Sequence, residues 1–200
     1  MTHIALDNNL PGIAGLMAHR PDTAAPLGHL ANVLLRTGSS TLEPGQRELI
    51  AAYVSQRNST PFCAGSHGAF AAAQLDGGNE LVASVLDDPD TAAIDDRMRA
   101  LLRVAAKVQE AARALPDETV AAAREAGATD EDIHDTVLIA ASFCMYNRYV
   151  SALATSLPED PETFYAQSAQ RITTAGYLLP ELSAAGGDSD LDPDAEAALA

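Results

Sequence analysis

Cys63 and His67 are the residues whose types and spacing most clearly suggest chemistry. On a helix, residues four apart share one face, so the imidazole could exchange a proton with the sulfur. Pro61 fixes its own φ and suits the first turn of a helix, so we expect a helix to begin there with Cys63 in its first turn. The free N–H groups of a helix start favour an anion. The pattern therefore predicts a reactive thiol with a lowered pKa.

Thr60 precedes this helix and is expected to be its N-cap, because a residue before proline avoids the helical conformation. Its hydroxyl would cap the helix or donate a hydrogen bond to the thiolate of Cys63. A purely structural interpretation also exists, since cysteine and histidine are often packed in alanine-rich cores. The second cysteine, Cys144, lies on an apolar stripe and is expected to pack there. It could pair with Cys63 only if the two Cα atoms lay within about 7 Å.

The elements that must position these side chains are all predicted to be helices. Alanine, the strongest helix former, supplies 40 of the 200 residues, and no segment shows the alternation of a strand. Pro21 and Pro26 are expected to separate two short N-terminal helices, because proline disrupts a helix interior. Gly77 and Gly78 are expected to close the helix of Cys63. The predicted helices cover residues 10–20, 27–35, 44–57, 61–75, 80–86, 92–115, 117–126, 129–157 and 163–177.

Charge and composition exclude several classes of function. The chain has 12 basic and 28 acidic residues, a net charge of −16, which argues against a nucleic-acid-binding surface. Its longest nearly apolar run, residues 136–146, is too short to cross a membrane, and residues 1–12 do not resemble a secretion signal. Two cysteines are too few for a disulfide scaffold, so we expect a reducing cytoplasm. Residues 183–200 carry five acids and no base, which predicts a disordered tail after a single domain.

Several segments together resemble the AhpD-like alkylhydroperoxidase and carboxymuconolactone decarboxylase superfamily. In that family a glutamate on one helix precedes C-x-x-C-x-x-x-H on the next, and here Glu48 precedes Cys63 and His67. The similarity also covers residues 10–16, 20–21, 147–148 and 176–177, as in members called peroxidase-related proteins. The resemblance implies an all-α, AhpD-like helical bundle over residues 1–182.

The resemblance also implies roles for individual residues. Cys63 matches the second motif cysteine, His67 the histidine of the family's proton relay, and Glu48 its glutamate. Thr60 stands where the first motif cysteine belongs, so no disulfide can form within the motif. Phe62 stands where some relatives carry a second histidine.

These implied roles suggest a thiol-dependent, antioxidant alkylhydroperoxidase of the peroxiredoxin type. Cys63 would form a sulfenic acid, the relay of His67 and Glu48 would move the proton, and an external thiol would reset the sulfur. Its partners would be a hydroperoxide or other small-molecule substrate, the thiol reductant and further copies of the chain. No cofactor is expected, and these three side chains are too few for a closed metal site.

Two alternatives remain open. A non-redox enzyme similar to carboxymuconolactone decarboxylase would use Glu48 and His67 as general acid and base on a small cyclic acid. A catalytically degenerate member would survive as an oligomeric binding protein, with Thr60 serving only as a good N-cap.

Overall fold

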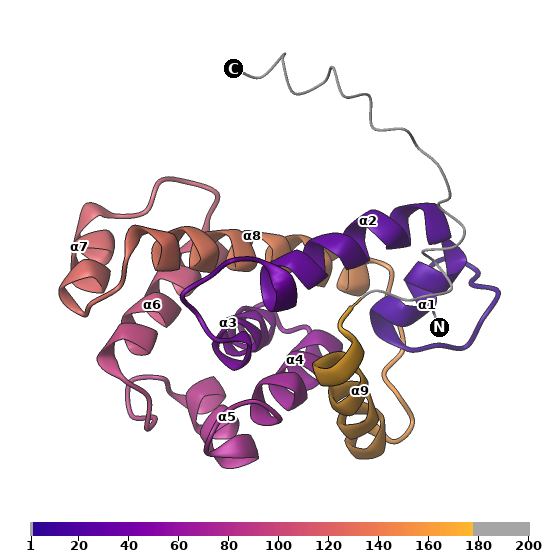
Figure 1. The fold of residues 1–200 in the computed structure, drawn as a ribbon. Helices are drawn as coiled ribbons and strands as arrows, with labels where there is room; N and C mark the ends of the chain where they lie inside the picture. The colour runs from indigo at the N-terminus through magenta and orange to yellow at the C-terminus, as the bar shows by residue number, and fades with distance from the viewer. Residues whose placement is uncertain (1, 178–200) are drawn as a thin grey trace.

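Nine α-helices and one short π-helical turn make up residues 2–177, the part of the chain that the computed structural model describes (Figure 1). The described residues contain no strand, which confirms the all-α prediction. The first four elements are α1 (Gly12–His19), α2 (Pro21–Asn32), the π-helical turn η1 (Val33–Thr37) and α3 (Pro44–Arg57). They are followed by α4 (Pro61–Ala72), α5 (Gly78–Asp87), α6 (Asp96–Glu110), α7 (Asp117–Glu125), α8 (Asp130–Ala152) and α9 (Pro161–Ala175).

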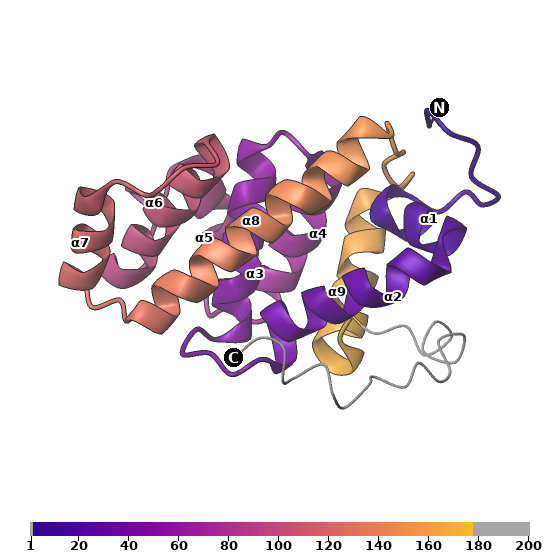
Figure 2. The ribbon, with the colours of Figure 1, turned by 90° about the horizontal axis from the view of Figure 1, so that it is seen from above.

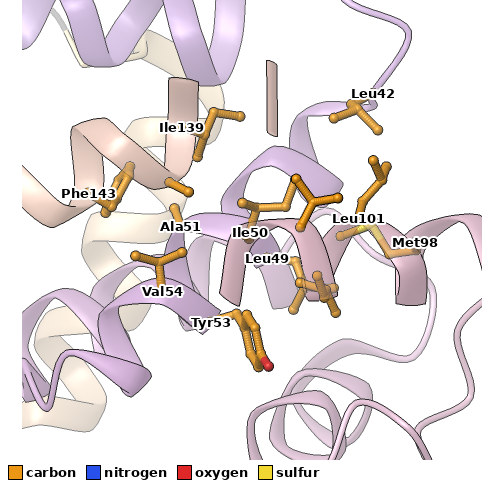
Figure 3. Close-up of a cluster of buried hydrophobic side chains, with 14 of the residues drawn as sticks. Leu42, Leu49, Ile50, Ala51, Tyr53, Val54, Met98, Leu101, Ile139 and Phe143 are labelled. Atoms are coloured by element: carbon orange, nitrogen blue, oxygen red, sulfur yellow. The ribbon is translucent and has the colours of Figure 1, made fainter. Parts of the chain in front are cut away.

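Helix α3 lies at the centre of the fold and packs against α4, α6 and α8. Residues 47–55 of α3 are buried on every side of the helix, and the run 49–54 at its centre has no charged side chain. Figure 3 shows Leu49 and Ile50 of α3 among side chains of α6 and α8, including Leu101, Ile139 and Phe143. Ala51 and Ala52 are fully buried, and their small side chains allow neighbouring helices to approach closely. This core fixes α3 and α4, the two helices that carry Glu48, Cys63 and His67.

Helix α9 closes the other side of α4. Both ribbon views place α9 beside α4, and seen from above it lies between α4 and α1 (Figures 1 and 2). The approach is close at Gly65, where a Cβ atom would lie 2.5 Å from the ring of Tyr165 on α9. Helix α8 crosses the molecule and contacts α1, α3 and α6 (Figure 2). Cys63 and His67 therefore face a space bounded by helices from both ends of the described chain.

The predicted break at Pro26 is wrong. Pro21 separates α1 from α2 but itself begins α2, and Pro26 lies inside that helix, which continues to Asn32. A proline in this place leaves the carbonyl of Asp22 without its helical donor. Both residues are exposed, so water can satisfy that carbonyl and the helix continues.

Other predicted boundaries differ by a few residues. The glycine pair does not close the helix of Cys63: α4 ends at Ala72, and the left-handed Gly77 directly precedes α5. Helix α6 begins later than expected because the side chain of Asp95 accepts a hydrogen bond from the backbone of Met98 and caps its start, and it ends at Glu110, before the predicted residue 115. Helix α8 ends early because Ala154 adopts a left-handed conformation with φ of 51°.

Two further expectations concern the acidic C-terminal segment and membrane-spanning helices. The predicted acidic tail, residues 183–200, lies outside the described residues. Within residues 2–177, none of the helices combines the length and apolar character that crossing a membrane requires.

Candidate active site

A cavity of about 430 Å³ lies between α4, α9 and the N-terminal helices, with Phe143 and Tyr146 of α8 also in its wall. Cys63 and His67 both line it, as their spacing on one helix face predicts. Most of the remaining wall is aliphatic or aromatic, including Ile13, Met17, Phe62, Phe70, Phe164 and Ile172. The size and apolar lining are typical of a site for a small organic molecule.

Glu48 lies behind His67 and is completely buried. Its Oε2 atom is 2.7 Å from Nδ1 of His67, and its Oε1 atom accepts a hydrogen bond of 2.6 Å from the hydroxyl of Tyr177. Both carboxylate oxygens therefore have a donor, which offsets the cost of burying the charge. If Glu48 is ionised, Nδ1 must carry the proton, and Nε2 keeps a lone pair that can accept another. The geometry thus suits His67 to act as a general base.

Three aromatic rings hold His67 in place. Phe143 meets the imidazole edge-on at a centroid distance of 4.5 Å, and Phe70 does so at 5.2 Å. Tyr177 stacks on it with an interplanar angle of 15°. Burial, together with the nearby charge of Glu48, raises the pKa of Tyr177 well above its usual value. Its hydroxyl therefore stays protonated and remains a donor to the carboxylate.

Cys63 is in the first turn of α4, as predicted, but its thiol is not acidic. The residue is 3% exposed and packs among Phe62, Val150 and Phe164. Burial raises the pKa of the thiol to about 11, and a hydrogen bond with Asn147 offsets only part of that effect. Removal of the sulfur from water thus outweighs the field of the helix start, and the prediction of a lowered pKa is wrong.

The described residues contain no hydrogen bond between Cys63 and His67. Both side chains nevertheless face the same cavity, so a proton could pass between them through a molecule bound there.

Thr60 occupies the N-cap position, but its hydroxyl has neither predicted role. Its side chain makes no capping hydrogen bond, and the hydroxyl lies 3.1 Å from that of Ser151 on α8 and 3.4 Å from the carbonyl of Asn58. The proximity of α8 gives this buried hydroxyl partners away from Cys63. Thr60 therefore helps join α4 to α8 and does not bind the sulfur.

Cys144 lies apart from the cavity lining and, like Cys63, is a free thiol. It packs against the main core, as its apolar stripe predicts. The amide nitrogen of Asn58 lies 3.7 Å from its sulfur and 2.8 Å from the side-chain oxygen of Asn147. The side chain of Asn58 thus contacts both Cys144 and Asn147.

Two residues of the site had no role assigned from the sequence: Tyr177, which donates to Glu48, and Asn147, which lowers the pKa of Cys63. Both belong to segments that carry the family resemblance, and this was the only signal that could have identified them. Among the described residues, no group of three or more histidines, cysteines and acids is arranged to hold a metal ion.

No protein-family model and no curated protein sequence matches the chain. Several solved structures do, among them two peroxidase-related proteins. An uncharacterized peroxidase-related protein from Ralstonia eutropha JMP134, described as an alkylhydroperoxidase AhpD core, is 27% identical, with a TM-score of 0.70 over 78% of this chain and 82% of the other. An uncharacterized peroxidase-related protein from Silicibacter sp. TM1040 is 29% identical, with a TM-score of 0.68 over 78% of each chain.

Proposed function

Since the chain is one of the AhpD-like, peroxidase-related proteins, we propose that it reduces hydroperoxides with Cys63 as its reacting thiol. The observation that carries this proposal is the shared cavity: the sulfur of Cys63 and the imidazole of His67 both line it, and buried Glu48 orients the imidazole. The apolar wall suits the organic part of an alkyl hydroperoxide.

The buried thiol has to lose its proton as it reacts. In the proposed step the sulfur attacks the terminal oxygen of the hydroperoxide, so an S–O bond forms while the O–O bond breaks. The sulfur is oxidised to a sulfenic acid, and the hydroperoxide is reduced to an alcohol. The thiol proton passes to Nε2 of His67 and from there to the departing alkoxide oxygen. His67 supplies the base that the raised pKa of Cys63 requires.

The sulfenic acid is then reset by an external thiol, because Thr60 leaves the motif without a second sulfur. The first molecule of thiol condenses with the sulfenic acid to give a mixed disulfide and water. A second molecule attacks that disulfide, which releases the Cys63 thiol and the oxidised reductant. We propose this intermolecular route in place of a cycling internal disulfide.

Trapping the intermediate tests the proposal. With the Cys144→Ser variant, whose only sulfhydryl is Cys63, cumene hydroperoxide should generate one site that reacts with dimedone, detected by mass spectrometry. His67→Asn should slow its formation by about a hundredfold or more, the usual effect of losing a general base. His134→Asn, on the exposed start of α8, should leave the rate unchanged. Peroxide consumption that persists in Cys63→Ser would overturn the proposal.

A second candidate function is general acid–base catalysis without the thiol. It is favoured by a specific observation: the pair of Glu48 and His67 is complete without any contact to the sulfur, whose pKa is raised to about 11. Its substrate would be a small cyclic acid, as the decarboxylase branch of the superfamily implies. Turnover of lactone acids that survives Cys63→Ala but is lost in His67→Asn would support this function over the redox one.

A further inference from the structure

Arg171 is the only permanently charged side chain that the described part of the chain contributes to the wall of the cavity. Apart from His67, the polar groups there are the thiol of Cys63, the serines Ser66 and Ser168, and the phenols of Tyr146 and Tyr177. Among residues 2–177, no acidic residue lines the cavity, although the chain carries 28 acids and 12 bases. The local charge of the wall is therefore opposite in sign to that of the whole chain.

Helix α9 carries this cation about two turns along from Phe164, which packs beside the thiol. Phe164, Ser168 and Arg171 lie four and then three residues apart, so they form one stripe on the face of α9 that lines the cavity. Phe164 packs in the cluster around Cys63, whereas Arg171 lies close enough to Tyr177 to influence its ionisation. Seven residues of helix separate the two ends of the stripe by about 10 Å. Helix α1 contributes the apolar side chains of Ile13 and Met17 to the same cavity.

The guanidinium of Arg171 is available to a ligand. It is exposed, and within residues 2–177 it makes no ion pair and no side-chain hydrogen bond. By contrast, the guanidiniums of Arg36 and Arg47 are occupied by polar groups of the protein. Leu10, also exposed, lines the cavity too. These exposed residues place the cation at the mouth and the thiol in the interior.

From this arrangement we infer that the cavity binds an amphipathic carboxylate, with its anionic group on Arg171 and its apolar chain along α9 towards Cys63. This inference rests on the proposed function for its chemistry: the substrate would be a hydroperoxide of a medium-chain carboxylic acid, with the O–O bond about 10 Å from the carboxylate. A neutral alkyl hydroperoxide would fill the apolar part of the cavity but would gain nothing from Arg171.

Binding of an unreactive probe tests the inference without peroxide chemistry. Isothermal titration calorimetry should show that octanoate binds the full chain about five to ten times more tightly than 1-octanol does. This ratio corresponds to roughly 1 to 1.4 kcal/mol, the contribution expected from one charge pair. Arg171→Gln should remove that preference, and Arg171→Lys should restore part of it. Arg113→Gln removes a charge from an exposed loop remote from the cavity lining and should change nothing.

A turnover measurement then separates the inference from the proposed function. A hydroperoxide of octanoic acid should have a higher kcat/KM than its methyl ester, and Arg171→Gln should remove the difference through KM while kcat is retained. If octanoate is preferred but no hydroperoxide is turned over, the anion site stands and the proposed function fails. Equal binding of octanoate and 1-octanol, or a preference that survives Arg171→Gln, would overturn the inference whatever the activity.

Discussion

Two opposing influences act on the thiol of Cys63: the helix start favours its anion, and burial disfavours it. Because burial prevails and raises the pKa to about 11, almost all of the thiol is protonated at neutral pH. Only the thiolate is alkylated by iodoacetamide. In ligand-free Cys144→Ser protein we therefore expect the alkylation rate of Cys63 to rise about tenfold per pH unit from pH 7 to pH 10.

The same protein unfolded in urea provides the control. There the thiol is exposed to water, so its rate should level off above the ordinary cysteine pKa of about 8.5. A rate in the folded protein that also levels off below pH 9 would mean that the field of the helix start, and not burial, controls the sulfur.

The hydroxyl of Tyr177 is the second donor to the buried carboxylate of Glu48. In Tyr177→Phe this oxygen loses its donor while remaining buried, and hydrogen bonds to charged groups typically contribute about 2 kcal/mol. We expect the free energy of unfolding at pH 7, from urea denaturation, to fall by about that amount. Tyr165→Phe is the matched control, because the Tyr165 hydroxyl makes no hydrogen bond within residues 2–177. Equal stability of the two variants would refute the role given to Tyr177.

The sequence predicted the parts of the site that depend on local spacing. Cys63 and His67 face one cavity because they lie four apart on one helix. The contact of Glu48 with His67 was implied by the family resemblance and not by spacing. The sequence did not predict the pKa of the thiol, because Val150 and Phe164, which help cover the sulfur, come from the distant helices α8 and α9. Tyr177 was missed for the same reason, since 129 residues separate it from Glu48.

At the level of elements, the approach of α4 to α9 depends on Gly65. A Cβ atom there would lie 2.5 Å from the ring of Tyr165, so Gly65→Ala must push α9 away from α4 or displace that ring. We expect a loss of about 1 to 3 kcal/mol in the free energy of unfolding and weaker binding in the cavity that α9 lines.

Gly68→Ala on the same helix is the matched comparison. Its Cβ would meet nothing closer than Val82 at 3.6 Å, an ordinary contact, so the better helix propensity of alanine should make it neutral or stabilising by up to about 1 kcal/mol. If both variants lost the same stability in thermal and urea unfolding, the loss would come from α4 itself and not from its contact with α9.

Helix bounds were predictable where a local signal marks both ends. Helix α3 has the expected bounds, Pro44–Arg57, because proline opens it and Asn58 begins a turn before the next proline. The predicted start of α8 at residue 129 is close to the observed one: Thr129 is the N-cap, and its hydroxyl accepts a hydrogen bond from the backbone of Asp132. The error at Pro26 had a different cause: whether water reaches the carbonyl that a proline leaves free depends on which face of α2 is exposed.

At the scale of the whole molecule, Asp132 joins three parts of the chain that are distant in sequence. Its buried carboxylate accepts hydrogen bonds from Arg97 on α6, from Thr41 in the segment before α3, and from the backbone of Thr129. Burial alone would raise the pKa of Asp132, but these hydrogen bonds outweigh it and lower the pKa to about 2. The folded state therefore binds this proton less readily than the unfolded chain does.

The sign of the resulting pH dependence follows from that difference. A carboxyl whose pKa is lowered from 3.8 to about 2 stabilises the fold above pH 3.8, and this stabilisation, about 2 kcal/mol, is lost as the pH falls to about 2. The other acids are also protonated as the pH falls, and the change in net charge from −16 alters the stability of every variant. The informative quantity is therefore the difference in free energy of unfolding between the variant and the unmodified chain.

Urea denaturation should show Asp132→Asn less stable than the unmodified chain at pH 7, with the difference shrinking by about 2 kcal/mol between pH 5 and pH 2. Asp22→Asn removes an exposed ion pair with Arg20. The stability of this control should therefore differ little from that of the unmodified chain between pH 7 and pH 2. A gap for Asp132→Asn that stays constant with pH would show that its carboxylate does not link α6 and α8 through its charge.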